Sequence, residues 1–248
     1  TLSEHPLAQN RTHMMKQSPA QIYLAQERGV HETGGFRSAT TFNFGTYFHP
    51  ARQPFAGIYL FNDDVLDAGR TLNMEVPEAS FVVLLPVMGA IGCTDPSGEE
   101  NLVAAGQMQV FTASAGQRFS IRNPFPEGLV NFLQIWIRAS VPVSGSYLTN
   151  YNPADHLNQF CALTPPELGK MQLPFSVSLG YFAGRGEATY IPKFADAKCF
   201  LFAIEGAFET EGRLLHARDG LGLWELESIE TEALSHGAMM LLIEMGWA

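Results

Sequence analysis

The side chains best suited to bind a metal ion or to move a proton at neutral pH are the histidines, of which this chain has seven. Two imidazoles reach one ion from a single strand or helix turn when they are spaced H-x-H or H-x-x-H. No pair here has either spacing, because the histidines stand alone at positions 5, 13, 31, 49, 156, 216 and 236. Isolated histidines are more often surface or structural residues, so the sequence favours no metal site built from them.

A carboxylate draws attention in the stretch "NMEVPEASFVVLLPVMG" (73–89), where Glu75 precedes an almost wholly apolar run from Phe81 to Val87. If Glu75 lies at the mouth of an apolar cavity, desolvation would suit it to act as a general base or to grip a cationic or hydroxylated ligand. If it lies in solvent beside Glu78, it is an ordinary surface acid. The spacing leaves both interpretations open.

The three cysteines, Cys93, Cys161 and Cys199, are odd in number and lack C-x-x-C spacing. This pattern argues against a disulfide framework and for a reducing compartment. Residues 1–18 are expected to form a polar tail without an apolar signal core, and Met14 or Met15 could be the natural start. No run approaches the ~18–20 apolar residues of a membrane helix. We therefore expect a cytoplasmic protein that does not enter a membrane.

The charge balance excludes one class of partner. The chain has 25 acidic residues against 15 lysines and arginines, a net charge of −10. Nucleic acid would be repelled unless a local basic patch exists. The nearest approach to a patch is Arg118 with Arg122, which is too small to follow a phosphate backbone. We expect no nucleic-acid binding.

Short apolar or alternating runs separated by turn residues predict an all-β fold. The stretch "FAGIYLFNDDVLDAG" (55–69) predicts a strand that ends at the turn-forming cluster Asn62–Asp63–Asp64. Residues 95–98, "DPSG", combine the side chains of a tight turn. The run "LVNFLQIWI" (129–137) is nearly continuous in apolar residues, which is typical of a strand that is buried on both faces or that faces a barrel interior.

The pattern divides into two all-β domains in tandem, residues 19–140 and 171–248. Between them, residues 141–170 hold four prolines and little periodic apolar signal, which predicts a connector with at most a turn or two of helix.

Several segments together resemble the pirin family, the bicupins that include the pirin-like quercetin dioxygenases. They are "GFRSATTFNFGTYF", "FNDDVLDAG", "DPSGEENLVAAGQMQVFTASAG", "LQIWI" and, near the end of the chain, "EGAFETEG", "DGLGLWE" and "LLIEM". The resemblance implies two tandem cupin domains, jelly-roll-like β-barrels packed together. It also implies a single divalent metal in the first domain, typically iron.

The resemblance assigns the metal to a His-x-His pair and a His-x-Glu pair. In this sequence the first pair falls on Glu75 and Pro77, and the second falls on Phe119 and Ile121. Only Glu75 has a side chain that can ligate a metal. We therefore expect these four residues to line a pocket that has lost its metal, and we expect no cofactor.

The resulting expectation is a metal-free, non-catalytic or regulatory bicupin that binds a small molecule or a protein partner. Two enzymatic alternatives stay open. One is a quercetinase-type dioxygenase whose metal is held by other ligands, and the other is a metal-independent acid–base enzyme that uses Glu75.

Overall fold

The computed structural model describes residues 17–140, 145–165, 167–168 and 171–246. Almost all of their regular structure is β, with two short 3-10 helices, η1 (Ala25–Glu27) and η2 (Pro153–His156). The expected polar tail, residues 1–18, lies almost wholly outside the described residues. In the part of the chain that is described, no helix has the length and apolarity needed to cross a membrane.

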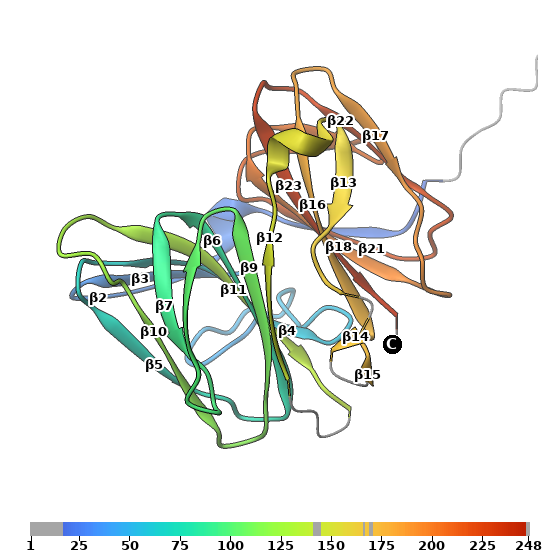
Figure 1. Ribbon diagram of the computed structural model, residues 1–248. Coiled ribbons are helices and arrows are strands. Elements are labelled where there is room, and N and C mark those ends of the chain that lie inside the picture. The colour runs from blue at the N-terminus through green and yellow to red at the C-terminus, as the bar shows by residue number, and fades with distance from the viewer. Residues whose placement is uncertain (1–16, 141–144, 166, 169–170, 247–248) are drawn as a thin grey trace, which may run out of the picture.

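The first cupin domain consists of a large sheet and a small sheet that face each other (Figure 1). The large sheet has seven strands in the order β12 (Ser146–Asn150), β9 (Gln107–Ala113), β6 (Ser80–Met88), β11 (Val130–Arg138), β4 (Ile58–Leu66), β3 (Phe36–Thr40) and β2 (Gly29–Thr33). The small sheet has four strands in the order β5 (Thr71–Glu75), β10 (Arg118–Arg122), β7 (Ala90–Thr94) and β8 (Glu100–Ala104). The turn predicted at 95–98 is confirmed, since Gly98 donates to the Asp95 carbonyl and has φ of 87°.

The central strands of the large sheet, β4, β6 and β11, are buried on both faces, which accounts for their nearly continuous apolar sequences. Side chains alternate along β11, so Phe132 and Trp136 pack toward the small sheet, whereas Leu133 and Ile135 pack toward the second domain. The strand predicted at 129–137 is confirmed as one of these central strands, paired with β4 on one side and β6 on the other.

The predicted end of a strand at Asn62–Asp63–Asp64 is wrong. Strand β4 continues through all three residues to Leu66 and is paired along this length with both β3 and β11. Turn propensity is a local preference, and hydrogen bonding to a neighbour on each side outweighs it here. Because β4 stays extended, Asn62 and Asp64 point into the first domain and Asp63 points away from its interior.

The second cupin domain repeats the arrangement of two facing sheets. Its large sheet has the order β1 (Ala20–Tyr23), β21 (Gly220–Leu223), β18 (Lys198–Glu205), β23 (Ala238–Met245), β16 (Phe175–Phe182) and β13 (Gln159–Ala162). Its small sheet has the order β17 (Glu187–Tyr190), β22 (Ile229–Ala233), β19 (Phe208–Thr210) and β20 (Arg213–Leu215). A separate two-stranded ribbon joins β14 (Glu167–Leu168) to β15 (Met171–Gln172).

The two domains share more chain than the sequence indicates. Strand β1 precedes the first domain but pairs with β21 of the second, and this blue segment runs beside the orange and red domain in Figure 1. The described part of 141–170 is also more than a connector, because β12 pairs with β9 of the first domain and β13 pairs with β16 of the second. The expected boundaries at 19, 140 and 171 therefore do not match the limits of the sheets.

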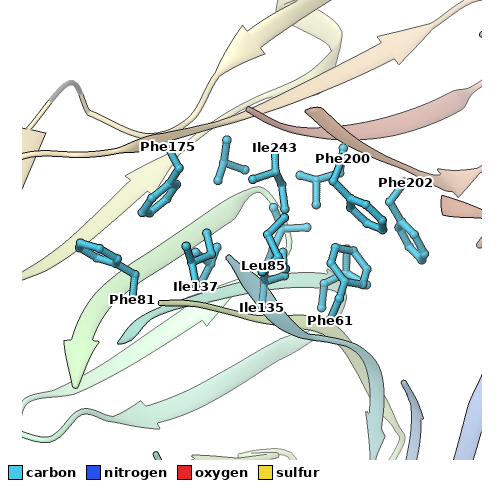
Figure 2. Close-up of a cluster of buried hydrophobic side chains, with 14 of the residues drawn as sticks. Phe61, Phe81, Leu85, Ile135, Ile137, Phe175, Phe200, Phe202 and Ile243 are labelled. Carbon is cyan, nitrogen blue, oxygen red and sulfur yellow. The ribbon is translucent and has the colours of Figure 1, made fainter. Parts of the chain in front are cut away.

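A continuous apolar core joins the domains. Figure 2 shows aromatic and aliphatic side chains of the first domain facing those of the second across the interface. Phe61 makes the closest aromatic contacts, with ring centroids 5.0 Å from Phe200 and 4.7 Å from Phe202. An interface this apolar holds two domains as one body.

Candidate ligand cleft of the first domain

Two of the four predicted site residues lie inside the first domain. Phe119 and Ile121 are buried on the inner face of β10, where Phe119 packs edge-on against Phe111 and Trp136 at centroid distances of 5.1 and 5.8 Å. Their cross-strand partners on β5 are Met74 and Leu72. These inner positions are filled by packed apolar side chains.

The other two predicted residues, Glu75 and Pro77, are exposed at the end of β5 and just beyond it. Glu75 pairs in register with Arg118, and Arg118 Nε donates to Glu75 Oε2 at 2.8 Å. Directly paired residues share a face, so Glu75 and Arg118 lie on the outer face of the sheet and Phe119 lies on the inner one. A surface hollow is lined by Glu75 and Phe119 but not by Pro77 or Ile121, so the structure does not bring all four predicted residues together.

The residues at these four positions do not fit a divalent metal. Phe119 and Ile121 offer no donor atom, Pro77 offers no side-chain donor, and the Glu75 carboxylate lies on the face opposite to Phe119 and Ile121. Across the described residues, no group of three or more histidine, cysteine, aspartate or glutamate side chains is arranged to hold a metal. His5 and His13 lie outside these residues.

A cleft of about 500 Å³ opens in the first domain, where the edges of the two sheets diverge between β2 and β5. Its rim is largely aromatic and includes Phe36, Phe44 and Tyr47, with His31 and Met74 beside them. The Tyr47 hydroxyl donates to the Glu27 carbonyl at 3.0 Å, which fixes the ring.

The position of the Tyr47 ring depends on a glycine. A Cβ atom on Gly29 would lie only 2.4 Å from the nearest ring atoms of Tyr47, so any other residue would displace the ring. The absence of a side chain on Gly29 therefore determines the shape of the rim.

The floor of the cleft is polar and comes from three adjacent strands. Ser38 on β3 is the direct partner of Asp64 on β4, and Asn62 on β4 is the direct partner of Gln134 on β11. All four are buried, and all four line the cleft. Three of their oxygen atoms, Ser38 Oγ, Asn62 Oδ1 and Asp64 Oδ1, have no hydrogen-bond partner among the described residues.

The carboxyl group of Asp64 is perturbed by its surroundings. Burial raises its pKa to about 7, and the neighbouring Asp63 adds to this effect, whereas the Ser38 hydroxyl and Arg28 act to lower it. Near neutral pH, Asp64 is therefore divided between its charged and neutral forms. A buried group with such a pKa in a cleft marks a candidate functional site.

These floor residues were missed by the sequence interpretation because Asn62–Asp63–Asp64 resembles a turn. A signal was nevertheless present, since polar residues interrupt a run that is apolar before and after them. Alternation along a strand could have indicated that Asn62 and Asp64 share a face.

Two family models match the chain, one for each domain. Residues 23–137 match the model described as Pirin, and residues 175–245 match the model described as Quercetinase C-terminal cupin domain. Among curated relatives, a protein named quercetin 2,3-dioxygenase from Escherichia coli (strain K12) is 25% identical over 231 residues, which cover 89% of this chain and 97% of that protein. A pirin-like protein from Caulobacter vibrioides is 27% identical over 223 residues, with coverages of 86% and 94%.

Solved structures agree with this fold. The crystal structure of YhhW from Escherichia coli aligns with a TM-score of 0.81 at 20% identity, covering 93% of this chain and 99% of YhhW. The structure described as bacterial pirin YhhW in complex with nickel(II) aligns with a TM-score of 0.80, also at 20% identity, covering 93% of this chain and all of that one. With one family model matched over the first cupin domain and the other over the second, this chain belongs to the pirin family of bicupins.

Proposed function

We propose that this chain is a metal-independent pirin-family protein that binds a small, planar, hydroxylated molecule in the first-domain cleft without converting it. The observation that carries the proposal is the floor of that cleft, where three buried oxygen atoms lack a partner. Buried polar atoms are normally satisfied, and leaving them without a partner is costly. A ligand that donates hydrogen bonds to these atoms would satisfy them.

The shape and chemistry of the cleft support a flat ligand. The rings of Phe36, Phe44 and Tyr47 offer apolar faces on which a ring can stack, and the polar floor offers hydrogen-bond acceptors. Several relatives are named quercetin 2,3-dioxygenase, and quercetin is a planar compound with several hydroxyl groups. Quercetin is thus a suitable first probe.

The proposed role is regulatory: the ligand would control contact with a protein partner. The proposal that no metal takes part rests on the donor atoms, because only one of the four assigned positions carries a ligating side chain and it faces outward. We also propose a cytoplasmic location, which the three free cysteines support.

A quercetinase-type dioxygenase is the second candidate, favoured by the names of the relatives. It requires a metal bound by residues other than Glu75, Pro77, Phe119 and Ile121. The third alternative is acid–base catalysis by Glu75. Two observations speak against it: the Glu75 side chain is 53% exposed, and it forms an ion pair with Arg118.

The proposal is tested by elemental analysis of the purified protein together with quercetin binding in air. We expect no stoichiometric iron, nickel or copper, saturable binding of quercetin and no loss of its absorbance. Ser38→Val should weaken binding about fivefold, since it removes one hydrogen bond worth roughly 1 kcal/mol. Glu75→Gln is the matched control and should bind like the unmodified protein.

Other results would decide between the candidates. A stoichiometric metal together with consumption of quercetin would establish the dioxygenase instead. Equal binding by the unmodified protein and Ser38→Val would show that the cleft is not the site.

A further inference from the structure

The side chains below the cleft form a chain of hydrogen bonds with a fixed direction. The Trp136 indole nitrogen can only donate, so the Gln134 amide must turn its oxygen toward it, at 2.9 Å. The amide nitrogen of Gln134 then donates to Asp64 Oδ2, also at 2.9 Å. Trp136 thereby commits one oxygen of Asp64 to accepting a hydrogen bond.

The other oxygen, Asp64 Oδ1, has no partner among the described residues. The proton that Asp64 gains or loses therefore resides on Oδ1. Ser38 lies directly opposite on β3, and its hydroxyl acts to lower the pKa of the Asp64 carboxyl, but Ser38 Oγ also has no hydrogen-bond partner among the described residues. Both residues line the cleft, but Ser38 is 6% exposed whereas Asp64 is fully buried. A ligand would meet the Ser38 hydroxyl first, with Asp64 behind it.

Few charged groups surround Asp64, so the ionisation of its carboxyl group depends mainly on the residues that lie directly beside it. Asp63 precedes it on β4, and Arg28 contributes a positive charge from the segment before β2. His31 on β2 and Tyr47 of the rim line the same cleft. Strands β3, β5 and β11 present Ser38, Met74 and Gln134 to it, none of which is charged.

We propose that Asp64 couples ligand binding in this cleft to the loss of a proton, with Ser38 as the intermediary. The inference rests on the proposed function. With a ligand bound and Asp64 ionised, the Ser38 hydroxyl donates to Asp64 Oδ1, a hydrogen bond that is not formed in the structure, and Ser38 Oγ and Asn62 Oδ1 accept from the ligand. When Asp64 is protonated, it donates to Ser38 Oγ, and the Ser38 hydrogen turns toward the ligand.

The preferred ligand is a neutral ring with two hydroxyl groups. Ser38 and Asn62 are diagonal neighbours on adjacent strands, roughly 7–8 Å apart at the backbone, which one ring with two hydroxyls can bridge. A phenolic hydroxyl donates better than it accepts, because its oxygen lone pair is delocalised into the ring. Such a ligand therefore binds the ionised form of Asp64 more tightly and releases a proton.

The probe for the experiment is resorcinol, a ring with two hydroxyls that stay neutral near pH 7. For the unmodified protein, its affinity measured by calorimetry should rise about tenfold from about pH 6 to about pH 8 and level off above that. The heat of binding should vary with the buffer, because a proton is released. Asp64→Asn, which cannot ionise, should bind with no such pH dependence, and Glu75→Gln should behave as the unmodified protein.

A second measurement needs neither a ligand nor a stable Asp64 variant. The indole N–H signal of Trp136 in NMR spectra, assigned with Trp136→Phe, should shift with pH around a midpoint near 7 because Gln134 links Trp136 to Asp64. A Trp136 signal that does not titrate would overturn the inference.

The outcomes separate the two proposals. Resorcinol binding that is independent of pH, or that weakens as pH rises, would refute proton coupling and leave the proposed cleft standing. No binding of either resorcinol or quercetin at any pH would refute both.

Discussion

At the scale of single residues, burial decides which carboxylate matters. Glu75 and Asp64 are both acidic residues on strands of the first domain, but Glu75 is solvated and paired with Arg118, whereas Asp64 is fully buried. Burial of Asp64 holds back its ionisation, and Asp64, unlike Glu75, lines the cleft. Asp64 is therefore the better candidate for a chemical role, although its turn-like sequence did not indicate one.

The pKa of Asp64 predicts how stability depends on pH. Its pKa is raised from 3.8 to about 7 on folding, so the folded state binds a proton that the unfolded state has already lost between those values. The stabilisation is complete below about pH 4, is lost as pH rises toward 7, and changes little above that. At pH 8, Asp64→Asn should be more stable than the unmodified protein by roughly 2–4 kcal/mol, and the difference should shrink toward pH 4.

Urea unfolding of both proteins across this pH range measures the difference. Glu75→Gln serves as the control because its surface ion pair is worth at most about 1 kcal/mol. A constant difference between Asp64→Asn and the unmodified protein would contradict the prediction.

At the scale of elements, the register of strand β5 determines which of its side chains face the interior of the first domain and which face solvent. Strand β5 turns Met74 and Leu72 inward, opposite Phe119 and Ile121, and turns Glu75 outward, opposite Arg118. A shift of a single residue would exchange these faces. The polar and apolar partners of β10 thus hold β5 in one register.

Pairs of introduced histidines can test this register. Directly opposed residues have Cβ atoms about 4.5–5.5 Å apart on one face, so Glu75→His with Arg118→His should create a surface site for nickel. Glu75→His with Phe119→His places the imidazoles on opposite faces, and we expect it to bind nickel at least tenfold more weakly. Calorimetric titration with nickel compares them, and tighter binding by the second pair would show that β5 is shifted.

At the scale of the whole molecule, the two domains stabilise each other. Phe200 of the second domain packs against Phe61 and Phe42 of the first, and against Tyr23 on β1. A polar cluster accompanies this core: Asp63 lies 3.6 Å from Arg28 and 3.4 Å from Arg218 of the second domain. Burial lowers the pKa of Arg28 to about 10, although the neighbouring Asp63 acts to raise it.

This packing predicts a single unfolding transition. Phe200→Ala should cost about 3–5 kcal/mol and should lower the stability of both domains together. Phe48→Ala is the control, since Phe48 is 72% exposed and its loss should change stability by less than about 0.5 kcal/mol. Urea unfolding followed by far-UV and near-UV circular dichroism measures both, and two separated transitions would show that the domains unfold independently.

The amino-acid sequence alone determined the β class, because apolar alternation and turn residues such as those at 95–98 are local signals. The cupin fold of the two domains followed from the resemblance of several segments to the pirin family. It also identified which residue types occupy the positions that the resemblance assigns to metal ligands. It did not determine which way Glu75 points or that β4 passes through Asn62–Asp63–Asp64.

Only the tertiary structure decided those points. It also revealed the cleft and the pairing of β1 with β21 of the second domain. The physical reason is the two-residue period of a strand. Alternate side chains of a strand face opposite sides of the sheet, and which group faces inward depends on partner strands that are distant in the sequence. Asp64 acquires its raised pKa only when those partners bury it.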